Sequence, residues 1–409
     1  MSIYEVKKRQ FQKNLAKSWL AKWRVRLSYL LLMVGVMPWG HEALAQAAWQ
    51  KVKELTLPNG IQALDWHPDG RHVALTYGTN LAQVWNVETG QGLATFTSTR
   101  WGTNQSGKEI GFSPDGKYLV VQDVISYQDK HTKFPRGLTS PSELAAREDK
   151  TRYQIGRVLA WPSLEETAKL MGPGSVMHDA QMSGFCWTGG KPSVFAVHRN
   201  AAVALYSFPQ GKLMDEVSIL HPYKRHQNVD KALWWRMVCD PLRPKVAVQG
   251  ALINDADLKA LDMPPERGPT PIAIVDLAAK RLERTLITRD ALNGVVFTAD
   301  GHYLVAYGLP PMQVWDAAKE FKQVGTISEP DQKTGTMVAL QDDWIAGMSD
   351  SLHIWRAGTQ QKAKQDQALA RFSWRTAFHA PSQTLAVARG NTLTLYRLQA
   401  QAVTFAPQR

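Results

Sequence analysis

Short apolar runs separated by polar turns recur along most of the chain. The clearest unit spans residues 61–96 and contains four runs, at 61–66, 72–77, 82–87 and 92–96. Pro-Asp-Gly separates the first two runs, and Glu-Thr-Gly separates the last two. Runs of strand length broken by such turns predict antiparallel hairpins. Four strands repeated about every 40 residues are typical of a propeller blade.

Two columns of residues repeat with these units. The first run of each unit ends near Trp66, Phe112, Cys186, Cys239, Phe297 and Phe378, with Leu340 standing for a weaker sixth unit. The third run ends near Trp85, Trp161, Tyr206, Val275, Trp315, Trp355 and Tyr396. Seven endings of the third run predict an all-β fold, a seven-bladed propeller. Because the tryptophans sit at repeat positions, we expect them to pack between sheets rather than to stack on a ligand.

The turns and the endings of the third run resemble WD40-type repeats. The residues that carry the resemblance are Pro68-Asp69-Gly70, Pro114-Asp115-Gly116, Ala299-Asp300-Gly301, Trp85-Asn86 and Trp315-Asp316. The resemblance covers roughly residues 49–398. It is to divergent bacterial WD40-like propellers, since the Gly-His dipeptide of many eukaryotic repeats is missing. It implies that the strand-like run at 49–57 completes the last blade and closes the ring, which removes exposed sheet edges.

Two segments exceed the repeat length, residues 126–152 in the second unit and 251–270 in the fourth. Both fall between a second and a third strand. In the WD40 family these loops share a side of the disc with the loops between blades, which are also long at 97–109, 172–182 and 221–232. The extra sequence is therefore expected on one rim, around blades two to four. Long loops on a rigid scaffold commonly carry binding residues.

Basic and aromatic residues alternate in two of these loops. The candidate binding residues are Tyr127, Lys130, His131, Lys133, Phe134, Arg136, Tyr223, Lys224, Arg225 and His226. This composition suits an acidic protein surface, an anionic glycan, a membrane surface or phosphate groups. The alternative is a pair of solvated loops of ordinary composition.

The charge of the chain is unevenly placed. Among its 409 residues 44% are hydrophobic and 21% charged, which is typical of a globular protein, and the formal charge is +12. Residues 1–45 hold eight basic and two acidic residues, a net of +6, so the remaining 364 residues also carry +6. This mildly basic balance suits an acidic partner, and we expect no nucleic-acid partner.

The N-terminal segment has the order of a secretory signal. Basic residues up to Arg26 precede an apolar run at 27–37, and Ala43-Leu44-Ala45 supplies small residues at a cleavage site. We expect residues 1–45 to be removed, which leaves residues 46–409 as a periplasmic propeller. The alternative is an uncleaved anchor in the inner membrane, although the apolar run is shorter than the roughly 20 residues of a span.

Cys186 and Cys239 are the only cysteines. Export would favour a disulfide between them. Both occupy the same column in neighbouring units, however, so their side chains are predicted to point the same way around the ring. A disulfide requires Cα atoms within about 7 Å and converging Cβ vectors. We therefore expect two separate, buried, small hydrophobic residues.

Motifs of catalysis are missing from the sequence. Neither a His-Glu-x-x-His nor a Gly-x-Ser-x-Gly motif occurs. The P-loop-like spacing at 102–108 is followed by Glu109 and a strand-like run instead of Ser or Thr and a helix. No catalytic residue, metal or cofactor is predicted. His67 and His379 share a position before the turn, which indicates a role in the repeat.

These observations predict a non-catalytic scaffold of the cell envelope. It would bind another macromolecule, most simply a protein, with the loop face of blades two to four. The alternative is a propeller enzyme of hydrolase or lactonase type, or a small-ligand binder, that uses the central channel. Such a site needs polar groups at one mouth of the channel, whereas the predicted inner strands offer mostly apolar and small residues.

Overall fold

The computed structural model describes thirteen segments of the chain. They are residues 49–77, 81–97, 109–125, 152–173, 185–187, 194–199, 202–218, 236–249, 270–288, 292–328, 334–349, 351–362 and 375–398. Within them the structure is entirely strands and their connections, so no helix capable of crossing a bilayer occurs in these segments. The strands belong to one compact unit, Gln46–Gln399.

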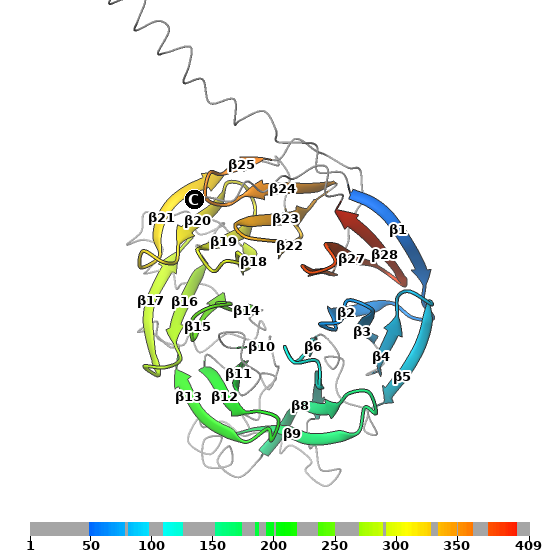
Figure 1. Ribbon diagram of the computed structural model, residues 1–409. Helices are drawn as coiled ribbons and strands as arrows, with labels where there is room; N and C mark the ends of the chain where they lie inside the picture. The colour runs from blue at the N-terminus through cyan, green and yellow to red at the C-terminus, as the bar shows by residue number, and fades with distance from the viewer. Residues whose placement is uncertain are drawn as a thin grey trace, which may run out of the picture. The chain divides into compact units, whose positions relative to one another are not determined.

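The described strands form seven antiparallel sheets of four strands each, arranged in a ring (Figure 1). The all-β propeller expected from the repeats is confirmed, and the sheets match the seven predicted blades. In each blade the first strand lies nearest the centre of the ring and the fourth lies at the rim. The blades therefore follow one another along the chain, as in repeat architectures generally.

The strand bounds follow the order of the blades. Blades 1 to 4 contain β2 (Ile61–Trp66), β3 (His72–Tyr77), β4 (Leu81–Asn86), β5 (Gln91–Thr97); β6 (Ile110–Phe112), β7 (Tyr118–Ile125), β8 (Arg152–Ala160), β9 (Glu166–Pro173); β10 (Phe185–Trp187), β11 (Val194–Arg199), β12 (Ala202–Ser207), β13 (Leu213–Ser218); β14 (Arg236–Cys239), β15 (Lys245–Gln249), β16 (Pro271–Asp276) and β17 (Arg281–Ile287). Blades 5 to 7 contain β18 (Leu292–Phe297), β19 (Tyr303–Gly308), β20 (Met312–Asp316), β21 (Lys322–Ile327); β22 (Thr336–Ala339), β23 (Trp344–Met348), β24 (Leu352–Arg356), β25 (Gln361–Lys362); β26 (Arg375–His379), β27 (Thr384–Arg389), β28 (Thr392–Leu398) and β1 (Trp49–Thr56).

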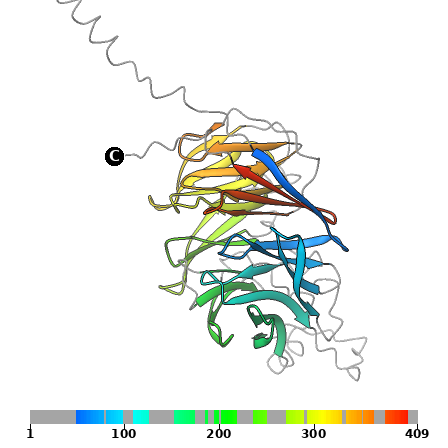
Figure 2. The ribbon, with the colours of Figure 1, turned by 45° about the vertical axis from the view of Figure 1, so that its right-hand side comes forward.

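The ring is closed by its first strand. β1 pairs antiparallel with β28, from Trp49 opposite Leu398 to Thr56 opposite Thr392. Figures 1 and 2 show β1 beside β28, the last strand of the chain. The prediction that the N-terminal run completes the last blade is confirmed. This pairing places the first and last strands of the chain in one sheet and so closes the ring.

The core lies between blades. Six hydrophobic clusters are found in the described residues, and each joins strands of two neighbouring blades. The five column tryptophans belong to these clusters, with Trp66, Trp315 and Trp355 buried and Trp85 and Trp161 packed at their margins. The expected packing role of the tryptophans is confirmed. These clusters lie at six boundaries between neighbouring blades, so the fold is stabilised step by step around the ring.

Cys186 and Cys239 form a disulfide, so the expectation of two separate thiols is wrong. Their Cα atoms lie 5.5 Å apart, and the bond joins the inner strands of blades 3 and 4. The error is one of register. Trp187, not Cys186, packs toward blade 2 as the column residues do toward their preceding blades. A shift of one residue turns a strand side chain to the opposite face, so Cys186 points toward blade 4 and meets Cys239.

Candidate functional site

The connections between strands give the ring two unlike faces. Because the strands of each blade are antiparallel, the connections from second to third strands and those between blades emerge on one side, here named the insertion face. The opposite side, here named the turn face, carries the connections from first to second and from third to fourth strands. Counted between the strand bounds, every turn-face connection has four to six residues.

Two connections on the insertion face are far longer than their equivalents. β7 and β8 are joined by 26 residues (126–151), and β15 and β16 by 21 residues (250–270). The same connection in each of the other five blades has two or three residues. Both long connections join the second and third strands of their blades, blade 2 and blade 4.

The ten predicted binding residues lie outside the described residues. They are Tyr127, Lys130, His131, Lys133, Phe134, Arg136, Tyr223, Lys224, Arg225 and His226. The first six fall in the connection from β7 to β8, and the last four fall between β13 and β14, which is a connection between blades. By the order of the strands, the strand ends that these two connections join lie on the insertion face.

Charged residues gather where the inner strands begin, on the insertion face. Arg236 opens β14, Arg375 opens β26, and Glu109 directly precedes β6. Arg236 Nη1 donates a hydrogen bond to the Tyr307 hydroxyl at 3.1 Å. Tyr307 passes so close to Gly294 on the inner strand β18 that a Cβ there would lie 2.4 Å from the hydroxyl oxygen. A residue larger than glycine at position 294 would therefore clash with the Tyr307 hydroxyl.

These four residues share one electrostatic environment although they come from blades 2, 4, 5 and 7. Burial lowers the pKa of Arg375; the charge of Glu109 acts in the opposite direction, and that of Arg236 lowers the pKa further. Two arginines against one carboxylate leave a net positive charge in this environment, which favours an anion over a cation. The expected apolar lining of the inner strands therefore does not extend to their starts at the insertion face.

Asp65 lies on the inner strand β2 with its carboxyl enclosed. Burial raises the pKa of this carboxyl to about 7, and hydrogen bonds from backbone N–H groups oppose the rise. One of these comes from Phe112 on β6, whose N–H donates to Oδ2 at 2.8 Å. Asp65 therefore links blades 1 and 2, and its ionisation changes near neutral pH.

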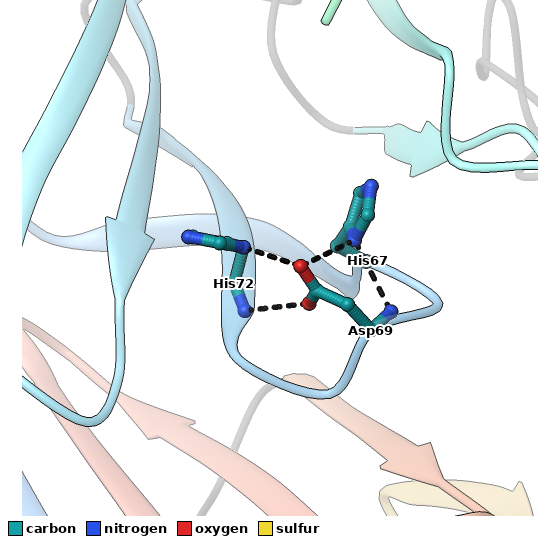
Figure 3. A group of neighbouring side chains, drawn as sticks. All are labelled: His67, Asp69 and His72. Atoms are coloured by element: carbon teal, nitrogen blue, oxygen red, sulfur yellow. Dashed lines mark hydrogen bonds and ion pairs between the residues drawn. The ribbon is translucent and has the colours of Figure 1, made fainter. Parts of the chain in front are cut away.

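Two histidines and one aspartate, residue types that can ligate a metal ion, lie together on the turn face, between β2 and β3. His67 Nδ1 lies 3.0 Å and His72 Nδ1 lies 2.7 Å from the same carboxylate oxygen, Asp69 Oδ2 (Figure 3). One ligand atom from each residue falls within 4.8 Å of the others. Burial raises the pKa of Asp69, but the hydrogen bond from the Arg71 N–H and the neighbouring imidazoles of His72 and His67 outweigh it, so the net pKa is lowered. The carboxylate is accordingly ionised at neutral pH.

The sequence signal for this group is the spacing His-x-Asp-x-x-His within one turn. A search for ligand pairs on helices misses it, since the ligands converge through a tight turn between strands. Asp69 Oδ1 accepts the N–H groups of Arg71 and His72 at 2.8 and 3.2 Å. Gly70 has a φ of 70°, a left-handed conformation that glycine adopts without strain. The backbone thus directs Oδ2 toward both imidazoles.

His67 and His379 each contact the next blade, which confirms their expected role in the repeat. His67 Nε2 lies 3.0 Å from the Gly116 carbonyl of blade 2, and His379 Nε2 lies 3.1 Å from the Pro68 carbonyl of blade 1. His379 Nδ1 also accepts the Ser382 N–H at 3.2 Å, so the proton of that ring is on Nε2. Arg243 of blade 4 likewise contacts the next blade, since its Nη2 donates a hydrogen bond to the Gly301 carbonyl of blade 5 at 2.5 Å.

Comparisons with known proteins give no assignment. No protein-family model matches the chain, and no curated protein matches it in sequence. Functional inference therefore begins from the propeller fold and from the placement of its side chains.

Proposed function

We propose that this propeller is a binding scaffold whose insertion face holds another macromolecule, most simply a protein. The observation that carries the proposal is the asymmetry of the connections. The connections at 126–151 and 250–270 are 26 and 21 residues long and join strand ends on one face, whereas the connections on the other face have four to six residues. Packing between blades does not require such length, but a binding surface on a rigid scaffold commonly uses it.

The chemistry of the proposed surface favours an acidic partner. Lys130, Lys133, Arg136, Lys224 and Arg225 supply positive charge in its connections. Tyr127, Phe134 and Tyr223 lie beside them in the sequence and supply the aromatic contacts that interfaces favour. The positive charge would accelerate association, and the aromatic groups would anchor the complex. An anionic glycan or an anionic membrane surface offers the same charge, and the experiment below separates these partners from a protein.

The closed ring suits this role energetically. The pairing of β1 with β28 joins the ends of the ring, and the clusters between blades hold the strands that carry the insertions. A scaffold that is already ordered loses little conformational entropy when it binds. The affinity can then be set by the connections on the insertion face.

A channel site is the second candidate function. Arg236, Arg375, Glu109 and Tyr307 come together from four blades at the insertion-face end of the inner strands. Such a set would bind a small anion, or an anionic side chain of the macromolecular partner. A hydrolase or lactonase that used the channel would place its substrate there. Arg236→Gln would then abolish small-anion binding measured by calorimetry, without loss of the folded state.

We also propose that the chain is exported to the periplasm. Residues 1–45 have the sequence order of a signal peptide, and the Cys186–Cys239 disulfide suits an oxidising compartment. N-terminal sequencing of the protein purified from the envelope should begin at Gln46. A protein that retains Met1 would favour an uncleaved membrane anchor.

Kinship with divergent bacterial WD40-like propellers is likewise a proposal, supported by the Pro-Asp-Gly turns and the Trp-Asn and Trp-Asp endings.

An affinity experiment from envelope extract tests the scaffold. The protein with a C-terminal tag should recover a specific partner. Changing Lys130, Lys133, Arg136, Lys224 and Arg225 to Glu should abolish recovery. The matched control reverses five exposed basic residues on the turn face, Arg71, Lys117, Lys212, Arg281 and Lys322, and should leave recovery intact.

The composition of the recovered material separates the partners. A protein that survives glycosidase and detergent treatment supports the proposal. Recovery of glycan or lipid alone would show that the surface binds one of those partners instead of a protein. If the turn-face control loses the partner as completely as the insertion-face variant, the insertion face is not the binding surface.

A further inference from the structure

The turn between β2 and β3 departs from two equivalent turns of the same ring. Residues 67–72, 113–118 and 298–303 have the same backbone hydrogen bonds, with the first residue N–H donating to the sixth residue carbonyl at 2.9 Å in each. Their central Asp and Gly are also the same. The first and sixth residues are Ser113 and Tyr118 in blade 2 and Thr298 and Tyr303 in blade 5, but both are histidine in blade 1.

The hydroxyl groups of blades 2 and 5 satisfy the aspartate. Ser113 Oγ donates to Asp115 Oδ1 at 2.6 Å, and Thr298 Oγ1 donates to Asp300 Oδ1 at 2.5 Å. The hydroxyl in turn accepts the N–H of the sixth residue at 3.0 Å in both turns. In these two turns the hydroxyl therefore finds both its acceptor, the aspartate Oδ1, and its donor, the N–H of the sixth residue, within the turn.

In blade 1, His67 Nδ1 directs a lone pair toward the aspartate, whereas the hydroxyl of Ser113 or Thr298 directs a proton toward it. The contact between His67 Nε2 and the Gly116 carbonyl requires a proton on Nε2. His67 Nδ1 accepts the Asp69 N–H at 3.1 Å and also lies 3.0 Å from Asp69 Oδ2, which is itself an acceptor. Two lone pairs at this distance repel each other, and a cation bound between them would remove the repulsion. His72 Nδ1, 2.7 Å from the same oxygen, adds a second imidazole.

The surroundings match those of a bound metal. Metal-ligating histidines almost always donate their other ring N–H to a carbonyl or carboxylate, as His67 does to Gly116. The rings of Phe112 and Trp161 lie 4.8 and 5.8 Å from that of His67, and Trp161 lies 5.4 Å from His72. The side chains of His67 and His72 are 12% and 17% exposed, and that of Asp69 is 35% exposed. An aromatic wall thus shields the imidazoles, while the carboxylate side stays open to solvent.

We infer that His67, Asp69 and His72 form a binding site for a divalent transition-metal ion of the Zn²⁺ type. Two imidazoles and a carboxylate suit Zn²⁺ better than Mg²⁺ or Ca²⁺, which prefer oxygen ligands. Bonds of about 2.0–2.1 Å to a tetrahedral ion place ligand atoms roughly 3.3 Å apart. The three ligand atoms already lie within 4.8 Å of one another, so small side-chain rotations suffice. Water from the open side would supply the fourth ligand.

The ion would also strengthen the contact between blades 1 and 2. Metal at Nδ1 fixes the His67 proton on Nε2, which is the atom that meets the Gly116 carbonyl of blade 2. We therefore expect Zn²⁺ to bind and to raise the melting temperature together.

The test is a titration of metal-free protein, without a histidine tag, with Zn²⁺ alone. Calorimetry should show one equivalent bound with micromolar or tighter affinity, and Co²⁺ in its place should give the visible absorption of a tetrahedral site. The double variant His67→Ser, His72→Tyr reproduces the turn of blade 2 and should fold without metal. Because it loses two of three ligands, its affinity should fall by at least about 100-fold.

Two further variants keep the test decisive. His72→Gln retains the contact between His67 and Gly116 and should weaken Zn²⁺ binding even if the double variant fails to fold. His302→Ala removes a histidine whose Nδ1 lies 3.0 Å from Asp300 Oδ2 in a turn with no second imidazole, and should leave affinity unchanged. Failure of the wild-type protein to bind Zn²⁺, or equal binding by wild type and the His72→Gln variant, would overturn the site. Equal weakening by His302→Ala would do the same.

Discussion

At the scale of single residues, side chains that join neighbouring blades carry much of the stability. Trp315 on β20 is 4% exposed and belongs to a cluster that contains Ile272 and Ile274 of blade 4. His67 and His379 reach carbonyl groups of the next blade in the same way. A substitution at one of these positions should therefore weaken a boundary between two blades.

Trp315→Ala should destabilise the fold severely. Removing a buried tryptophan costs about 3–5 kcal/mol, because the lost contacts leave a cavity that the surrounding strands cannot fill. Thermal unfolding monitored by circular dichroism is the measurement, with the exposed substitution Leu93→Ala as control. An unchanged melting temperature for Trp315→Ala would show that the tryptophan does not hold blades 4 and 5 together.

Asp65 predicts a specific dependence of stability on pH. Its pKa is raised from 3.8 to about 7 in the fold, so between these values the folded protein binds a proton that the unfolded chain does not. The free energy of unfolding should fall as pH rises through this range and level off above it. At about 1.4 kcal/mol per pKa unit, the fall is at most roughly 4 kcal/mol.

Asp65→Asn should remove this fall. Urea unfolding of both proteins between about pH 4 and about pH 8 measures the contribution of Asp65. The other carboxylates and histidines titrate in both proteins, so their contribution cancels in the difference. A difference between wild type and variant that does not change across this interval would contradict the account of the Asp65 environment.

At the scale of strands and turns, the sequence repeat predicts where each strand lies better than it predicts which neighbouring blade each side chain faces. Alternation of apolar runs and Asp-Gly turns located the strands because side-chain period and turn chemistry are local properties. The disulfide was missed because a one-residue shift in β10, only three residues long, reverses which blade a side chain meets. The His67, Asp69 and His72 group was missed because its convergence depends on the path of a tight turn. Arg236 and Arg375 were missed because the blades that bring them together are far apart in the sequence.

Loss of the disulfide should weaken the boundary between blades 3 and 4. Cys186 and Cys239 are separated by 53 residues, and closing a loop of this length stabilises a fold by about 4 kcal/mol in the chain-entropy model. The Cys186→Ala, Cys239→Ala double variant should melt at a lower temperature than the oxidised wild type. The reduced wild-type protein should resemble the variant. Equal melting temperatures for all three forms would mean that the bond is not made in solution.

At the scale of the whole molecule, one face of the ring is plain and the other is elaborated. The blades are joined through their cores, and the long connections leave the ring at strand ends on the insertion face. Folding and binding are therefore expected to separate, with strands responsible for the first and connections for the second.

Deleting residues 132–148 tests this separation. The segment lies within the connection from β7 to β8, so the protein should remain soluble and keep its melting temperature, whereas partner recovery should be lost. Solubility and thermal unfolding are measured beside the affinity experiment. Insoluble protein would show that this connection is part of the folded ring.

Hydrogen exchange of the protein, free and saturated with its recovered partner, tests the central claim most directly. Binding at the insertion face predicts slower exchange in the connection from β7 to β8, and at the adjoining ends of β7 and β8. The turn at residues 113–118 should exchange at the same rate in both states, since it lies on the turn face. Protection confined to the turn face would contradict the account and place the partner on the opposite side of the ring.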